Sequence, residues 1–142
     1  MSQALYTADA HVVGGRSGRG RTSDGRLEVE LEQPKELGGS GEGTNPEQLF
    51  AVGYAACFAS TISLVGQGLG VDADDVQIDS SVSLIALDGD RFGLGVELQV
   101  ALPSVPGERA VELVRAAHRA CPYSNATRGN VDVTLVVNGA RL

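Results

Sequence analysis

The chain has 142 residues, of which 42% are hydrophobic and 20% are charged, so we expect one globular domain spanning 1–142. A net charge of −7 argues against a nucleic-acid partner, because its phosphates would be repelled. The first residues lack a basic start followed by an apolar block, which predicts a cytoplasmic protein without an export signal.

The first third of the chain predicts two strands. Apolar residues alternate over 4–13, and apolar residues alternate with glutamate over 26–33. Between them, "GGRSGRGRTSDG" (14–25) is typical of a glycine-rich turn, and the arginines in it are expected to decorate that turn. A second glycine-rich loop follows over 34–44.

A long helix is predicted to begin near Asn45. Thr44 with Glu47 would form a capping box, whereas Asn45 followed by Pro46 would form a cap with proline at the first helical position. The helix should run to about Val65, and apolar residues lie on all its sides. We therefore expect a buried central helix. A membrane span is disfavoured because the strictly apolar part is short.

Two strong strands and a hairpin turn, "DGD", are predicted next. The strands cover 76–87 and 91–102, with these side chains pointing inward: Val76, Ile78, Val82, Leu84, Phe92, Leu94, Val96, Leu98, Val100 and Leu102. A helix over 107–120 and a strand over 131–137 complete a β-β-α-β-β-α-β order. Pro122 should stop that helix at Cys121, on its buried side. The fold class is α+β.

The chain lacks the common nucleotide, zinc-protease and serine-hydrolase motifs. His118 is expected to be a packed residue at the rim of the second helix. We expect no metal site, because a third ligand cannot be named. The two cysteines, Cys57 and Cys121, remain as either a redox pair or two unrelated core thiols, and periodicity alone favours core thiols.

If Cys57 is a nucleophile, a cation must stabilise its thiolate, because an apolar environment raises a thiol pKa. A carboxylate should then hold that cation, and Glu47 is the nearest acid in sequence. Ten helical residues separate the two by about 15 Å. Either a long arginine bridges the gap, or the helix breaks at Gly53, or Glu47 serves a second subunit. We favour an intertwined dimer.

Three segments resemble the organic hydroperoxide resistance proteins, the Ohr subgroup of the OsmC-like family: "GGRSG" (14–18), "GTNPEQLFAVGYAACF" (43–58) and "CPYSNATRGNVDVTL" (121–135). The resemblance covers essentially the whole chain. It implies antiparallel sheets around a buried central helix, in an intertwined homodimer with active sites at the subunit interface.

The resemblance also implies a thiol peroxidase that reduces alkyl, aryl and fatty-acid hydroperoxides to alcohols. The peroxidatic cysteine falls on Cys57, the resolving cysteine on Cys121, the activating arginine on Arg16 and the orienting glutamate on Glu47. Arg19 is the alternative arginine. The two cysteines would react through a Cys57 sulfenic acid, which then forms a Cys57–Cys121 disulfide.

The other implied features concern the substrate and the reductant. Phe50, Tyr54 and Phe58 would line an apolar pocket, no cofactor would be bound, and the dithiol of a lipoylated protein would reopen the disulfide. Two alternatives remain: a related thiol peroxidase of broader substrate range, and a non-enzymatic binder of apolar ligands or redox sensor with structural cysteines.

Overall fold

The computed structural model describes residues 2–142. The chain divides into two compact units, Met1–Leu49 and Phe50–Leu142, which are described separately below. Together they contain the α and β elements that the sequence predicts, along with short ones that it does not.

The first unit contains a three-stranded antiparallel sheet in the order β1-β2-β3. Its strands are β1 (Ala10–Val13), β2 (Arg19–Thr22) and β3 (Glu28–Glu30). The glycine-rich sequence 14–25 predicted a turn where β2 lies. Its residues, Arg-Gly-Arg-Thr, have no apolar alternation, and the strand exists because it pairs with neighbours on both sides.

The first unit buries few side chains. Leu31 is its one buried apolar side chain within the described residues, and the small Gly20 lies against it. Several larger apolar side chains of this unit are exposed: Leu5, Tyr6, Val12, Val13 and Leu27. The sheet therefore has no substantial core of its own.

Helix α1 (Pro46–Gly68) begins where the sequence predicts and extends three residues further. The Gln48 backbone N–H donates to Asn45 Oδ1 at 2.9 Å, which identifies Asn45 as the cap. The alternative capping box is not formed, because the Glu47 carboxylate is bound by Arg16. The helix is continuous through Gly53, so it does not break there.

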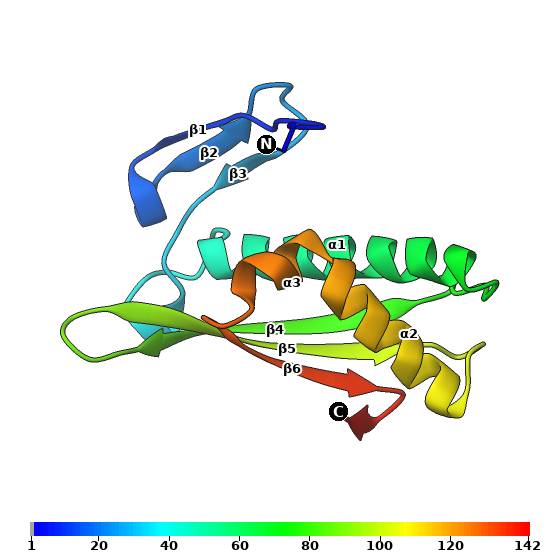
Figure 1. The fold of residues 1–142 in the computed structure, drawn as a ribbon. Helices are drawn as coiled ribbons and strands as arrows, with labels where there is room; N and C mark the ends of the chain where they lie inside the picture. Colours follow the sequence, from blue (N-terminus) through cyan, green and yellow to red (C-terminus); the bar gives the residue numbers. More distant parts are fainter. Residues whose placement is uncertain (1) are drawn as a thin grey trace. The chain divides into compact units, whose positions relative to one another are not determined.

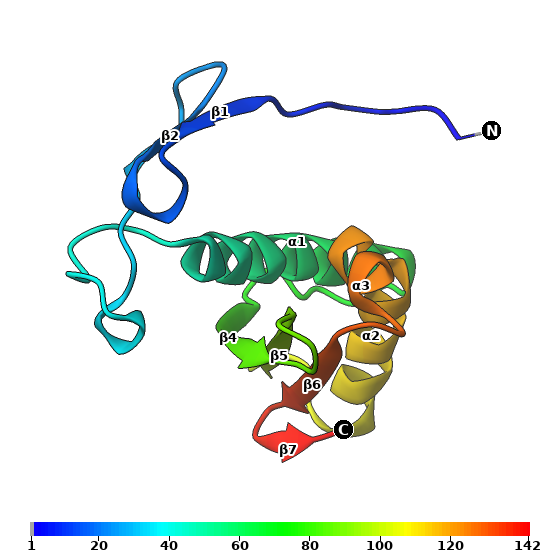
Figure 2. The same ribbon diagram turned by 90° about the vertical axis from the view of Figure 1, so that its left-hand side faces the viewer.

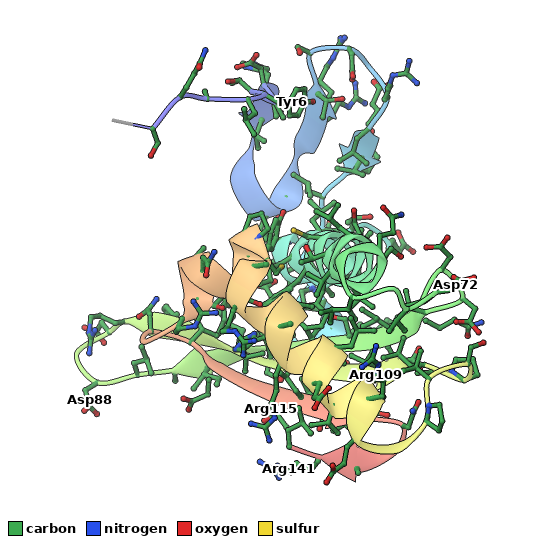
Figure 3. The ribbon with its side chains drawn as sticks, turned by 45° about the vertical axis from the view of Figure 1, so that its right-hand side comes forward. Tyr6, Asp72, Asp88, Arg109, Arg115 and Arg141 are labelled. Carbon is green, nitrogen blue, oxygen red and sulfur yellow. The ribbon has the colours of Figure 1, made fainter. Side chains whose placement is uncertain are left out.

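The second unit consists of a four-stranded sheet with helices on one face (Figures 1 and 2). The strands are β4 (Gln77–Ala86), β5 (Phe92–Ala101), β6 (Asp132–Val137) and β7 (Ala140–Arg141). Strands β4 and β5 form the predicted hairpin, with Asp88 at its turn (Figure 3). Strands β5 and β6 run parallel, whereas the other neighbours are antiparallel.

Helices α2 (Gly107–Ala120) and α3 (Pro122–Thr127) follow the hairpin. Helix α2 has the predicted bounds, and Arg109 and Arg115 lie along it (Figure 3). Short α3 was not predicted. Cys121 separates the two helices with extended backbone angles, φ −65° and ψ 127°, as the following proline favours.

The core of the second unit lies between the helices and the sheet. Tyr54, Phe58 and Ile62 of α1 contribute to it, together with the apolar side chains of α2, β5 and β6. Within the described chain the opposite side of α1 is exposed, including Val52 and Leu64, so the expectation of a helix buried on all sides is not met by one chain. By length and composition alone, α1 is also apolar enough to cross a membrane.

One inward prediction was wrong. Phe92 is 70% exposed, although Val96 and Leu98, which have the same parity on β5, are buried. Phe92 lies at the start of the strand, beside the hairpin turn. Strand alternation predicts which face a side chain points to, but not how far the covering helices extend over that face.

Candidate active site

In the first unit, Arg16 and Glu47 form a two-pronged ion pair. Arg16 Nη1 donates to Glu47 Oε2 at 2.9 Å, and Arg16 Nη2 donates to Oε1 at 2.6 Å. Both side chains are partly buried. The planar guanidinium matches the carboxylate, so this pairing fixes the orientation of Arg16 as well as its position.

The turn that carries Arg16 requires glycine. Gly14 and Gly15 have φ of 81° and 58°, values that favour glycine. A Cβ on Gly18 would lie 1.8 Å from the carbonyl oxygen of Val13, so the chain can close tightly only without a side chain there. The "GGRSG" segment thus builds a short 3₁₀ turn (Gly15–Ser17) that presents Arg16 to Glu47.

The ion pair favours the charged form of both partners. The hydrogen bond from Arg16 lowers the pKa of Glu47, against a smaller opposing effect of burial. The same hydrogen bond raises the pKa of Arg16. Arg19, the alternative arginine, pairs instead with exposed Glu30, its Nε lying 3.0 Å from Oε1. Arg16 is therefore the arginine that Glu47 orients.

In the second unit, Cys57 and Cys121 are free thiols in contact. Their Sγ atoms lie 3.5 Å apart, with Cys57 on α1 and Cys121 at the junction of α2 and α3. Cys121 is fully buried and Cys57 partly so. A disulfide needs about 2.05 Å between the sulfurs, so a modest side-chain movement would join them.

The environment of Cys57 favours its neutral form. Burial is the largest effect and raises the pKa of the Cys57 thiol, and the neighbouring Cys121 raises it further. A hydrogen bond from the backbone of Tyr123 acts in the opposite direction but does not cancel the burial effect. A reactive thiolate at Cys57 would therefore need an added positive charge.

The three aromatic residues expected to line a pocket differ in exposure. Tyr54 and Phe58 have no exposed surface and belong to the core, so they cannot touch a substrate without movement, whereas Phe50 is only partly buried. Tyr123, which was not predicted as a site residue, lies against Phe50 and Tyr54. Its ring centre is 5.8 Å from that of Phe50 and 5.6 Å from that of Tyr54. Its place two residues after Cys121 was the available signal.

Gly53 makes room for Tyr123. A Cβ at Gly53 would lie 2.8 Å from Tyr123 Oη and 3.4 Å from its ring. Gly53 lies one helical turn before Cys57, so its lack of a side chain lets the ring of Tyr123 lie against this part of α1. Among residues 2–142, no group of three potential metal ligands is found.

The OsmC-like protein family model matches residues 39–136. The chain belongs to this family. The organic hydroperoxide resistance protein of Xanthomonas axonopodis pv. citri is 50% identical over 137 residues, covering 95% of this chain and 96% of the relative. The matched region includes α1, both cysteines and most of the second sheet.

Two solved structures within this family agree with the fold. An organic hydroperoxide resistance protein from Legionella pneumophila is 50% identical, with a TM-score of 0.92 over 95% of this chain and 98% of that one. Organic hydroperoxide resistance protein OhrB of Bacillus subtilis is 44% identical, with a TM-score of 0.86 over 94% and 99%. The family assignment and the α+β fold predicted from sequence are therefore confirmed.

Proposed function

We propose that this protein is a cysteine-based thiol peroxidase that reduces organic hydroperoxides to alcohols and so protects against oxidative stress. The names of its relatives support hydroperoxide detoxification. The observation that carries the chemical assignment is the 3.5 Å contact between the sulfurs of Cys57 and Cys121. Two thiols so close can store and release a pair of electrons.

In the first step, the Cys57 thiolate attacks the distal oxygen of the hydroperoxide. The O–O bond breaks, Cys57 becomes a sulfenic acid, and the alkoxide leaves and takes up a proton to form the alcohol. Because burial raises the pKa of Cys57, this step needs a cation. We assign that role to Arg16, which would stabilise both the thiolate and the developing alkoxide, with Glu47 orienting it.

In the second step, Cys121 attacks the sulfenic acid, a disulfide forms and water leaves. An external dithiol then reduces the disulfide by exchange. We propose a lipoyl group on a partner protein, because a slim apolar arm suits a half-buried sulfur pair. No bound cofactor is needed for this cycle.

We propose that the substrate is apolar and that Phe50 and Tyr123 form its contact surface. Phe50 is partly buried and Tyr123 is 37% exposed, beside the Cys57 helix. Tyr54 and Phe58 would support this surface from the core. Such a surface favours alkyl, aryl or fatty-acid hydroperoxides over hydrogen peroxide.

We also propose a cytoplasmic, intertwined homodimer. The first unit has almost no core of its own, and α1 leaves apolar side chains such as Val52 and Leu64 exposed in the single chain. Both observations are accounted for if a second copy covers these surfaces. In this arrangement, the interface would complete the active site.

The experiment that tests the function is turnover of cumene hydroperoxide with dihydrolipoamide by the wild-type protein and Cys57→Ser. Wild type should consume the organic hydroperoxide far faster than hydrogen peroxide, and Cys57→Ser should be inactive while keeping its fold. Equal rates with hydrogen peroxide would indicate a thiol peroxidase of broader range. Undiminished turnover by Cys57→Ser would overturn the assignment and favour a ligand binder or sensor with structural cysteines.

A further inference from the structure

A buried chain of hydrogen bonds joins the three helices of the second unit. Its centre is Ser124 Oγ, which lies 2.7 Å from Tyr54 Oη and 2.9 Å from His118 Nδ1. Tyr54 and Ser124 have no exposed surface. Burying polar groups is costly unless they are paired, so this chain fixes the relative positions of the helices more specifically than apolar packing would.

One arrangement of hydrogens satisfies every member of the chain. His118 Nδ1–H donates to Ser124 Oγ, the Ser124 hydroxyl donates to Tyr54 Oη, and Tyr54 donates to Thr127 Oγ1 at 3.4 Å. Thr127 then donates to the Ser124 carbonyl oxygen at 3.2 Å. Since each group has one partner for its proton, removal of one hydroxyl leaves buried neighbours unpaired.

The members of this chain lie close to the cysteines in sequence. Tyr54 precedes Cys57 by three residues on α1, and His118 and Ser124 lie three residues before and after Cys121. The contact between His118 and Ser124 therefore spans the break between α2 and α3, where Cys121 has its extended backbone. Each sulfur lies within about one helical turn of an anchored side chain.

We propose that Tyr54, His118 and Ser124 form a polar clamp that holds the sulfurs of Cys57 and Cys121 in contact and so directs oxidised Cys57 into the disulfide. These are positioning residues, since their polar atoms bond to one another rather than to sulfur. Arg128 steadies the clamp by donating to the His118 carbonyl oxygen at 2.5 Å.

The clamp also determines what happens to the Cys57 sulfenic acid. This part of the proposal rests on the proposed function, because the sulfenic acid forms only in the peroxidase reaction. The Cys57 sulfenic acid and the Cys121 thiol combine to give a disulfide and water, whereas a second hydroperoxide would oxidise the sulfenic acid to sulfinic acid. Holding the Cys121 thiol beside the sulfenic acid raises the effective concentration of the thiol, so disulfide formation is faster than oxidation to sulfinic acid.

The test is the redox equilibrium of the two cysteines with dithiothreitol, which needs no peroxide. Tyr54→Phe and Ser124→Ala should each lower the equilibrium constant for the Cys57–Cys121 disulfide about five- to tenfold. Ser81→Ala, which removes an exposed hydroxyl on β4, should leave it unchanged. His118→Ala should lower it, and His118→Asn should restore part of the loss, because its amide can replace Nδ1.

Tyr54→Phe removes one oxygen and keeps the buried ring, so it remains informative if Ser124→Ala does not fold. If the folded variants keep the wild-type equilibrium constant for the Cys57–Cys121 disulfide, the proposed clamp is wrong. With cumene hydroperoxide, Ser124→Ala should form the sulfenic acid at the wild-type rate but yield several-fold more sulfinic acid by mass spectrometry. If the wild-type protein does not react with hydroperoxide, the proposed function fails, while the dithiothreitol equilibrium still decides the clamp.

Discussion

The sulfur atoms of Cys57 and Cys121 lie 3.5 Å apart, although 64 residues separate the two cysteines in the chain. Helix α1 supplies one and the junction of α2 and α3 supplies the other. The separation exceeds the about 2.05 Å of a covalent S–S bond and is a van der Waals contact, so a small side-chain movement would be enough to join the two sulfurs.

Replacing Cys121 should separate the two steps of the cycle. Cys121→Ser should still reduce one equivalent of organic hydroperoxide, but Cys57 should then proceed to sulfinic acid, because no thiol captures the sulfenic acid. Turnover with a dithiol should fall at least about tenfold under excess hydroperoxide. Intact-mass spectrometry would show this, and a fully reversible cycle without Cys121 would contradict it.

Arg16 and Arg19, two of the three arginines in the glycine-rich segment 14–25, offer a matched pair of variants. If Arg16 stabilises the Cys57 thiolate as proposed, Arg16→Ala should raise the pKa of the Cys57 thiol and slow its reaction with hydroperoxide by about 10²-fold or more, because the buried thiolate would lose that charge. Arg19→Ala removes an exposed arginine paired with Glu30 and should change neither quantity. Thiolate absorbance measured against pH would give the pKa of the Cys57 thiol in each variant. Equal effects of the two substitutions would remove Arg16 from its assigned role.

Glu47 should make stability depend on pH. Its pKa is lowered in the folded protein, so its contribution is present above the ordinary glutamate pKa and is lost as the pH falls through the folded value. Glu47→Gln should therefore be less stable at pH 7, by about 1 kcal/mol given the partial exposure of Arg16. Urea unfolding should show this difference shrinking below about pH 4.5. A difference that stays constant to pH 3 would exclude the ion pair as its cause.

A charge on the exposed side of α1 should disrupt the proposed dimer. Leu64 is 68% exposed in the single chain, and Leu64→Glu would place a carboxylate within the expected interface. Sedimentation velocity should show a shift toward monomer and lower activity. Ser81→Glu adds the same charge at an exposed polar position on β4, away from the exposed side of α1, and should preserve the dimer. A wild-type sedimentation coefficient for Leu64→Glu would argue against this interface.

The sequence predicts elements whose local signals are strong. Helix α2 has its predicted bounds because apolar spacing marks its body and Pro122 forces its end. The β4–β5 hairpin follows from alternation and from "DGD", in which Gly89 and Asp90 take positive φ. Strand β2 was missed because its pairing with β1 and β3, rather than its own residues, makes it a strand.

The residues of the candidate site also divide into those that the sequence predicted and those whose contacts depend on tertiary packing. Resemblance to the family singled out Arg16, Glu47 and both cysteines, and the structure brings them together as two pairs, one in each unit. Tyr123 and Ser124 were not predicted as site residues, because their contacts with Tyr54 arise only when α3 packs against α1. A six-residue helix has too little periodicity to predict its contacts.

The most direct test is the intact mass of the reduced protein before and after one equivalent of cumene hydroperoxide, without any reductant. The monomer should lose two hydrogens and both thiols should become inaccessible to alkylation, with the new bond mapped to Cys57 and Cys121. An unchanged mass with two free thiols, or oxygen added to Cys57 while Cys121 stays free, would contradict the proposed mechanism.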